Sequence, residues 1–143
     1  MRVWEAGTGR TIGVPFRGHK GSVWTISWSD DGHYIMSSAS MDATIIIWDV
    51  ESQRPAGEPL RGHTGPVKDS VYSTDYQRIV SVSGAGDGMI RMWDVRTREP
   101  IGEDLYDPSG DLDYITLSPD GRHIISSSHK SIRVWDTNAI TGT

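Results

Sequence analysis

The feature that most constrains this 143-residue chain is an internal repeat with a period of about 44 residues. The triplet Arg17-Gly18-His19 recurs as Arg61-Gly62-His63, and the pair Trp48-Asp49 recurs as Trp93-Asp94 and Trp135-Asp136. Two independent marks that recur together in register indicate a chain built from repeated supersecondary units. Because one such unit cannot bury a core alone, neighbouring units must stack against each other.

Within each unit, the sequence predicts short β-strands joined by tight turns. Runs of five or six residues with high β propensity end at Gly, Asp or Ser, and no window shows a helical period. Residues 54–60 predict a weaker fourth strand, which its prolines restrict to a sheet edge. We therefore expect an all-β fold. The stronger predicted strands are 23–28, 34–38, 43–48, 67–72, 78–82, 89–93, 112–117, 123–127 and 131–135.

These marks resemble the WD-repeat (WD40) family of β-propellers, over nearly the whole chain. The resemblance implies a partial propeller of about three four-stranded antiparallel blades plus a leading strand pair. Residues 1–17 would end a preceding blade, 18–61 and 62–106 would form two blades, and 107–143 a degenerate or incomplete one. Residues 57–64 also resemble WD-repeat arrays of mushroom-forming fungi.

The resemblance also implies a hydrogen-bonded set of four side chains, a structural tetrad, in each blade. Its members are a histidine of the Gly-His turn, a Ser or Thr of the second strand, an aspartate before the third strand, and the tryptophan. The third unit departs from this pattern, because Asp107-Pro108 replaces Gly-His and His129 stands where aspartate is expected, leaving Trp135 as the remnant. The matching residues elsewhere are His19, Ser38, Asp42 and Trp48, then His63, Ser83, Asp87 and Trp93.

Serine, histidine and aspartate in one network also suggest a hydrolase. A catalytic triad needs an exposed serine hydroxyl aimed at a carbonyl beside an oxyanion hole. Here the triple repeats with the period of the fold and ends on a tryptophan, which favours a structural role. The glycine-rich segment 84–88 precedes a strand rather than a helix, so a turn is favoured over a phosphate-binding loop. The five histidines lack close ligand spacing. We expect no catalytic residues, no metal and no cofactor.

The charge and composition narrow the partners. The net charge is −5 with acidic and basic residues interspersed, whereas nucleic-acid binding needs a clustered basic face. No apolar run approaches the length of a transmembrane helix. We therefore expect neither a nucleic acid nor a membrane as partner. The absence of cysteine excludes disulfides and slightly favours an intracellular, cytoplasmic location.

In the resembled family, the residue five positions after the Gly-His histidine lies at one rim of the propeller. The residue before the tetrad aspartate belongs to the same rim. Aromatic and charged groups on a rigid rim suit a protein contact, although a lone exposed tryptophan needs no function. Trp28, by contrast, falls where Tyr72 and Leu117 recur and is predicted to pack internally. The candidate contact rim consists of Trp24, Lys68, Met41, Gly86 and, by position only, Asp113.

The expected function is a non-catalytic scaffold that binds protein partners. Two alternatives stay open: recognition of a small ligand, such as a glycan or modified peptide, and self-assembly. Propellers typically close with four to eight blades, which three units cannot do. We expect the chain to be part of a larger propeller, whose remaining blades close the ring. The alternative is a homo-oligomer in which residues 11–17 of one copy fill the missing edge of another. An open three-blade arc is the third option.

Overall fold

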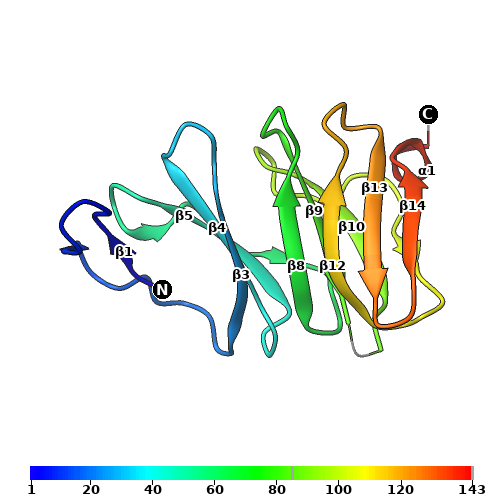
Figure 1. Cartoon of the computed structure of the whole chain (residues 1–143), viewed down its shortest axis with the longest axis horizontal. Coiled ribbons are helices and arrows are strands. Elements are labelled where there is room, and N and C mark those ends of the chain that lie inside the picture. Colours follow the sequence, from blue (N-terminus) through cyan, green and yellow to red (C-terminus); the bar gives the residue numbers. More distant parts are fainter. Residues whose placement is uncertain (85, 143) are drawn as a thin grey trace.

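The computed structural model describes residues 1–84 and 86–142 (Figure 1). In this part of the chain the strands form four antiparallel sheets, which stand side by side in chain order. The prediction of an all-β partial propeller is confirmed. The one helix of the described residues, α1 (Asn138–Thr141), was not predicted, because four residues are too few to show a helical period.

The sheets are named here by their order in the chain. The leading pair contains β1 (Val3–Trp4) and β2 (Thr11–Ile12). Sheet 1 contains β3 (Val23–Trp28), β4 (Tyr34–Ala39), β5 (Thr44–Asp49), β6 (Arg54–Pro55) and β7 (Leu60–Arg61). Sheet 2 contains β8 (Val67–Tyr72), β9 (Arg78–Ser83), β10 (Met89–Asp94) and β11 (Leu105–Tyr106). Sheet 3 contains β12 (Leu112–Leu117), β13 (His123–Ser128) and β14 (Ile132–Asp136).

The strongly predicted strands are all present, with ends within one residue of the prediction. The weak fourth strand at 54–60 is broken into β6 and β7, which pair with opposite ends of β5. The break contains Pro59, which has no backbone N–H to donate to the ladder. In Figure 1, β3, β8 and β12 lie next to one another, so the first strand of each sheet lines the same side of the array.

The core lies between consecutive sheets. We call the face of a sheet that looks toward the next sheet its trailing face, and the opposite one its leading face. The trailing face of sheet 1 packs on the leading face of sheet 2, and sheet 2 packs on sheet 3 in the same way. The first interface contains Met36, Ile45, Ile47, Leu60, Val67, Ile79 and Trp93. The second contains Val80, Val82, Ile90, Met92, Leu112, Ile115, Ile124 and Ile140.

Candidate functional site

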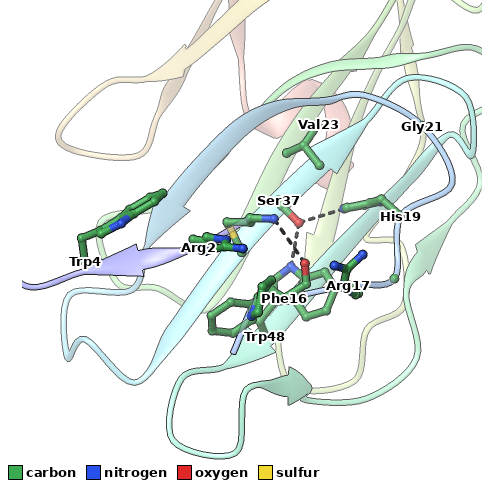
Figure 2. Close-up of a pocket in the computed structure, with 12 residues that line it drawn as sticks. Arg2, Trp4, Phe16, Arg17, His19, Gly21, Val23, Ser37 and Trp48 are labelled. Atoms are coloured by element: carbon green, nitrogen blue, oxygen red, sulfur yellow. Dashed lines mark hydrogen bonds between the residues drawn. The ribbon is translucent and has the colours of Figure 1, made fainter. Parts of the chain in front are cut away.

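A chain of hydrogen bonds joins the four polar marks of sheet 1. Trp48 donates from Nε1 to Ser37 Oγ at 2.7 Å, and His19 Nε2 lies 2.8 Å from the same oxygen. On its other side, His19 Nδ1 lies 3.0 Å from Asp42 Oδ2. Figure 2 shows Trp48, Ser37 and His19 joined in this way. The chain links the Gly-His turn to β4 and to β5, so it fastens three segments of one sheet.

Sheet 2 carries the same arrangement with deeper burial. Trp93 Nε1 donates to Ser81 Oγ at 2.8 Å, His63 Nε2 lies 2.8 Å from that oxygen, and His63 Nδ1 lies 2.7 Å from Asp87 Oδ2. A carboxylate only accepts, so Nδ1 carries the proton and Nε2 accepts from the serine hydroxyl. Ser83 also donates to Asp87 Oδ2 at 2.6 Å. Every donor in the chain therefore has an acceptor.

Two serines were assigned wrongly from the sequence. The residue that joins histidine to tryptophan is Ser37 rather than Ser38, and Ser81 rather than Ser83. Ser38 points to the other face of β4, where its Oγ lies 2.6 Å from Thr25 Oγ1, because successive side chains of a strand alternate between faces. Ser83 lies on the same face of its strand as Ser81, but Asp87 is the one tetrad residue that it contacts.

The third unit retains more than its tryptophan. Trp135 Nε1 donates to Ser126 Oγ at 2.8 Å. In place of the histidine, the buried Asp107 brings Oδ2 within 3.1 Å of Arg133 Nε. His129 lies outside this arrangement, with Nδ1 at 2.7 Å from Asp113 Oδ2 and a side chain that is 82% exposed. Sheet 3 thus keeps the bond between tryptophan and serine and has an ion pair at the sequence position of the missing histidine.

The geometry of these sets does not suit nucleophilic catalysis. Ser37 is 1% exposed and Ser81 is fully buried, and both hydroxyls already contact a tryptophan and a histidine. A serine nucleophile must reach a substrate carbonyl. Neither Ser37 nor Ser81 can do so in this conformation. Across residues 1–84 and 86–142, no group of three or more His, Cys, Asp or Glu side chains is placed to hold a metal ion.

The correction to Ser37 leads to a measurable difference between two adjacent serines. Ser37→Ala removes the partner of both Trp48 and His19, so we expect the free energy of unfolding to fall by about 1–3 kcal/mol. Ser38→Ala leaves only the half-buried Thr25 hydroxyl unpaired, and a smaller loss is expected. Urea unfolding of both variants gives the comparison. A larger loss for Ser38→Ala would contradict the assignment.

The sheet 2 pair also gives stability a pH dependence. Burial lowers the pKa of His63 more than its contact with Asp87 raises it. Burial acts to raise the pKa of Asp87, but hydrogen bonds from Ser83 and His63 outweigh it, and the pKa is lowered. As pH falls below 6.5, the unfolded chain takes up a proton that folded His63 resists. The contribution of Asp87 is lost only at lower pH, below 3.8.

We therefore expect the free energy of unfolding to decrease as pH is lowered through the range just below 6.5. The measurement is urea unfolding at a series of pH values between neutral and mildly acidic. His63→Asn, which cannot titrate, should show a shallower slope than the unmodified chain. Equal slopes for the two proteins would remove His63 as the source.

Three of the five candidate rim residues share an unpredicted backbone feature. A β-bulge interrupts the first strand of each sheet at the same place, and the extra residues are Trp24, Lys68 and Asp113. Bulges re-aim side chains, which removes these three from the regular alternation. Trp24 is 50% exposed, and Lys68 Nζ lies 4.1 Å from its ring centroid. The bulge was not predicted because alternation alone assumes an unbroken ladder.

The other rim residues are also at the surface. Met41 is 82% exposed beside the Gly-His turn, where Gly21 packs against it. Gly86 is exposed, and its backbone N–H donates to the Gly110 carbonyl at 3.2 Å. Asp113 is held by His129. The structure thus brings Trp24 and Lys68 into contact, and Gly86 and Asp113 contact other groups.

Comparison with known proteins agrees with this geometry. The family model described as WD domain, G-beta repeat matches residues 9–49, 55–94 and 105–136. A search of the curated proteins finds no match. No helix in the described ranges is long and apolar enough to cross a membrane. The three matched segments cover most of the chain, and each contains the first three strands of sheet 1, 2 or 3. The chain therefore belongs to the WD40 family of β-propeller repeats.

Proposed function

We propose that this chain is a non-catalytic scaffold that binds a protein partner through Trp24, Lys68 and Met41. The observation that carries the proposal is the contact of Trp24 with Lys68 across two neighbouring sheets. The ammonium group holds a half-exposed indole ring in place before any partner arrives. Preorganised tryptophans are typical anchors of protein interfaces, because little side-chain entropy is lost when they are buried.

The composition of the rim indicates what a partner must offer. The exposed indole ring and the thioether of Met41 need an apolar recess. The Lys68 ammonium group, which lies over the ring, needs a carboxylate beside that recess. The fitting partner surface is therefore a hydrophobic pocket with an acidic residue at its margin.

The test compares capture of cellular proteins by the unmodified chain and by two tryptophan variants. Trp24→Ala should weaken binding of a specific partner at least tenfold, which corresponds to about 1.4 kcal/mol. Trp4→Ala is the matched control, because Trp4 is 55% exposed but lies on the leading pair. A captured partner whose affinity is unchanged by Trp24→Ala, or reduced equally by Trp4→Ala, would refute the proposed rim.

A second candidate, recognition of a small ligand, is favoured by one cavity between sheets 1 and 2. Its volume is about 580 Å³, and its walls include Tyr34, Tyr72, Tyr76 and Arg98. The Tyr72 hydroxyl is buried without a hydrogen-bond partner in the described part of the chain, and burial raises its pKa to about 12. It therefore remains a donor for an acceptor on a ligand. Glycan and peptide arrays test this, with Tyr72→Phe expected to abolish any hit.

A further inference from the structure

The trailing face of sheet 3 is an apolar surface with nothing packed on it in the described structure. Ile132 is 75% exposed, Val134 65%, Tyr114 68% and Ile125 37%. The register places Ile125 opposite Val134 on neighbouring strands, and Tyr114 and Ile132 both opposite Ser127. These side chains therefore lie on one face and form one patch.

Counting from the tryptophans shows what normally covers such a face. Ile132 and Val134 stand three and one residues before Trp135, as Ile45 and Ile47 stand before Trp48. Ile45 and Ile47 are 1% and 2% exposed, because the leading face of sheet 2 packs on them. The equivalent residues of sheet 2, Ile90 and Met92, are 0% and 2% exposed against sheet 3. The residues of the patch are therefore of the kind that the leading face of a following sheet buries elsewhere in this chain.

A leading face with room for it exists at the other end of the chain. On sheet 1, Ile26 is 61% exposed and Trp28 is 48% exposed. The sequence predicts that Trp28 packs internally, and this prediction is wrong. Met1, Val3 and Phe16 cover only part of this face. A cavity of about 500 Å³ remains beside it, lined by Trp4, Phe16 and Trp48 among others (Figure 2).

The two ends are also complementary in their strands. β1 and β14 occupy equivalent positions of the repeat, since Val3-Trp4-Glu5 matches Val134-Trp135-Asp136. In the leading pair, β2 is the strand beside β1 on the outer side, whereas β14 pairs with β13 alone within the described residues. β14 can therefore take the place of β1 against β2, and it brings β12 and β13 with it.

We propose that two copies of this chain exchange these ends, so that β14 of each copy replaces β1 of the other. The trailing face of sheet 3 then packs on the leading face of sheet 1 of the second copy, as sheets 1 and 2 already pack within one chain. Applied twice about a two-fold axis, this contact gives a closed ring of six sheets, within the usual range for propellers.

Exchange of this kind is favoured because little is lost and much is buried. The contacts given up are the pairing of Val3 and Trp4 with β2, the backbone hydrogen bonds between Met1 and Phe16, and the packing of Met1 and Val3 on sheet 1. Ile132, Val134 and Trp135, which occupy the equivalent positions of β14, take their place. The additional burial comes from the exposed groups of both faces, including Ile26, Trp28, Tyr114 and Ile132. Closure also removes the unpaired outer edge of β14, which would otherwise invite aggregation.

Two substitutions at equivalent positions test the exchange because their expected effects have opposite signs. Val134→Asp places a charge in the new interface and should weaken the dimer at least tenfold. Val3→Asp loosens the competing strand β1 and should tighten the dimer. Val134 is 65% exposed in the single chain, so its variant should keep the sheet structure. Sedimentation velocity gives the dissociation constants, and circular dichroism checks the fold.

A crosslink identifies the contact itself. The chain has no cysteine, so Ile12→Cys and Val134→Cys each introduce one reactive thiol. Val3 pairs with Ile12, hence Val134 should lie opposite Ile12 of the second copy. A short bismaleimide should join the two variants when they are mixed, and neither variant alone. A chain that stays monomeric, forms open-ended polymers, or loses association equally in Val3→Asp and Val134→Asp would overturn the proposal.

Discussion

Trp93→Ala is expected to lower the free energy of unfolding by about 3–5 kcal/mol, because it opens a cavity in the interface between sheets 1 and 2. Trp93 is 1% exposed, and its indole ring lies beside His63 with 6.1 Å between ring centroids. Its removal also leaves Ser81 without the donor that fixes its hydroxyl. Urea unfolding followed by circular dichroism measures the loss.

Trp24→Ala is the control for this prediction. Trp24 is 50% exposed and lies on a bulge, so its truncation should cost no more than about 1 kcal/mol. The contrast between two tryptophans of one chain separates burial from residue type. A loss below about 1.5 kcal/mol for Trp93→Ala would show that this residue does not anchor the interface.

Asp87→Ala is expected to cost about 3 kcal/mol, since hydrogen bonds to a buried charged group are the most expensive to break. The carboxylate accepts from the Ser83 hydroxyl, from His63 and from both the backbone N–H and the hydroxyl of Thr64. Removing it leaves several donors unpaired in a site where the Asp87 side chain is 4% exposed. Thermal and urea unfolding should both register the loss.

The chain contains a matched exposed pair for comparison. Asp113 contacts His129 at the same 2.7 Å separation, but the His129 side chain is 82% exposed. Asp113→Ala should therefore cost less than about 1 kcal/mol, as is usual for surface ion pairs. Equal losses of stability in the two aspartate variants would show that burial does not determine how much the His63–Asp87 contact contributes to the free energy of unfolding.

The sequence was sufficient for the architecture because period and alternation are properties of the whole chain. The Gly-His and Trp-Asp marks located the sheets, and runs such as 67–72 and 112–117 gave strand limits that the structure reproduces. The match of the WD40 model to three segments agrees with that interpretation. Within the tetrads, His19, His63, Asp42 and Asp87 were found because each stands at a turn with a fixed sequence mark.

The serines were missed because the loop between the second and third strands varies in length. Ser37, Ser81 and Ser126 lie opposite Ile46, Arg91 and Arg133, each of which stands two residues before its tryptophan. The register across the sheet is therefore constant, while the separation along the chain is not. Counting back from the aspartate selected Ser38 and Ser83, whereas counting across the strand pair would have selected Ser37 and Ser81.

The remaining differences involve long-range contacts. Trp28 was predicted to pack because Tyr72 and Leu117 occupy the same repeat position, but packing also requires a neighbouring sheet. Next to sheet 1 stands only the two-stranded leading pair in the described residues, and it leaves 48% of Trp28 exposed. A repeat sequence specifies which positions face a neighbour, and the number of neighbours is a separate property.

The central claim is that the repeated polar sets fasten the strands of each sheet. Hydrogen exchange of the six tryptophan indole N–H groups, observed by NMR, tests it most directly. Trp48 and Trp93, which donate to buried serines, should exchange slowly, whereas Trp4 and Trp24, both at least half exposed, should exchange fast. Ser37→Ala should accelerate exchange at Trp48 and leave Trp93 protected. Fast exchange at Trp48 and Trp93 in the unmodified chain would contradict the claim.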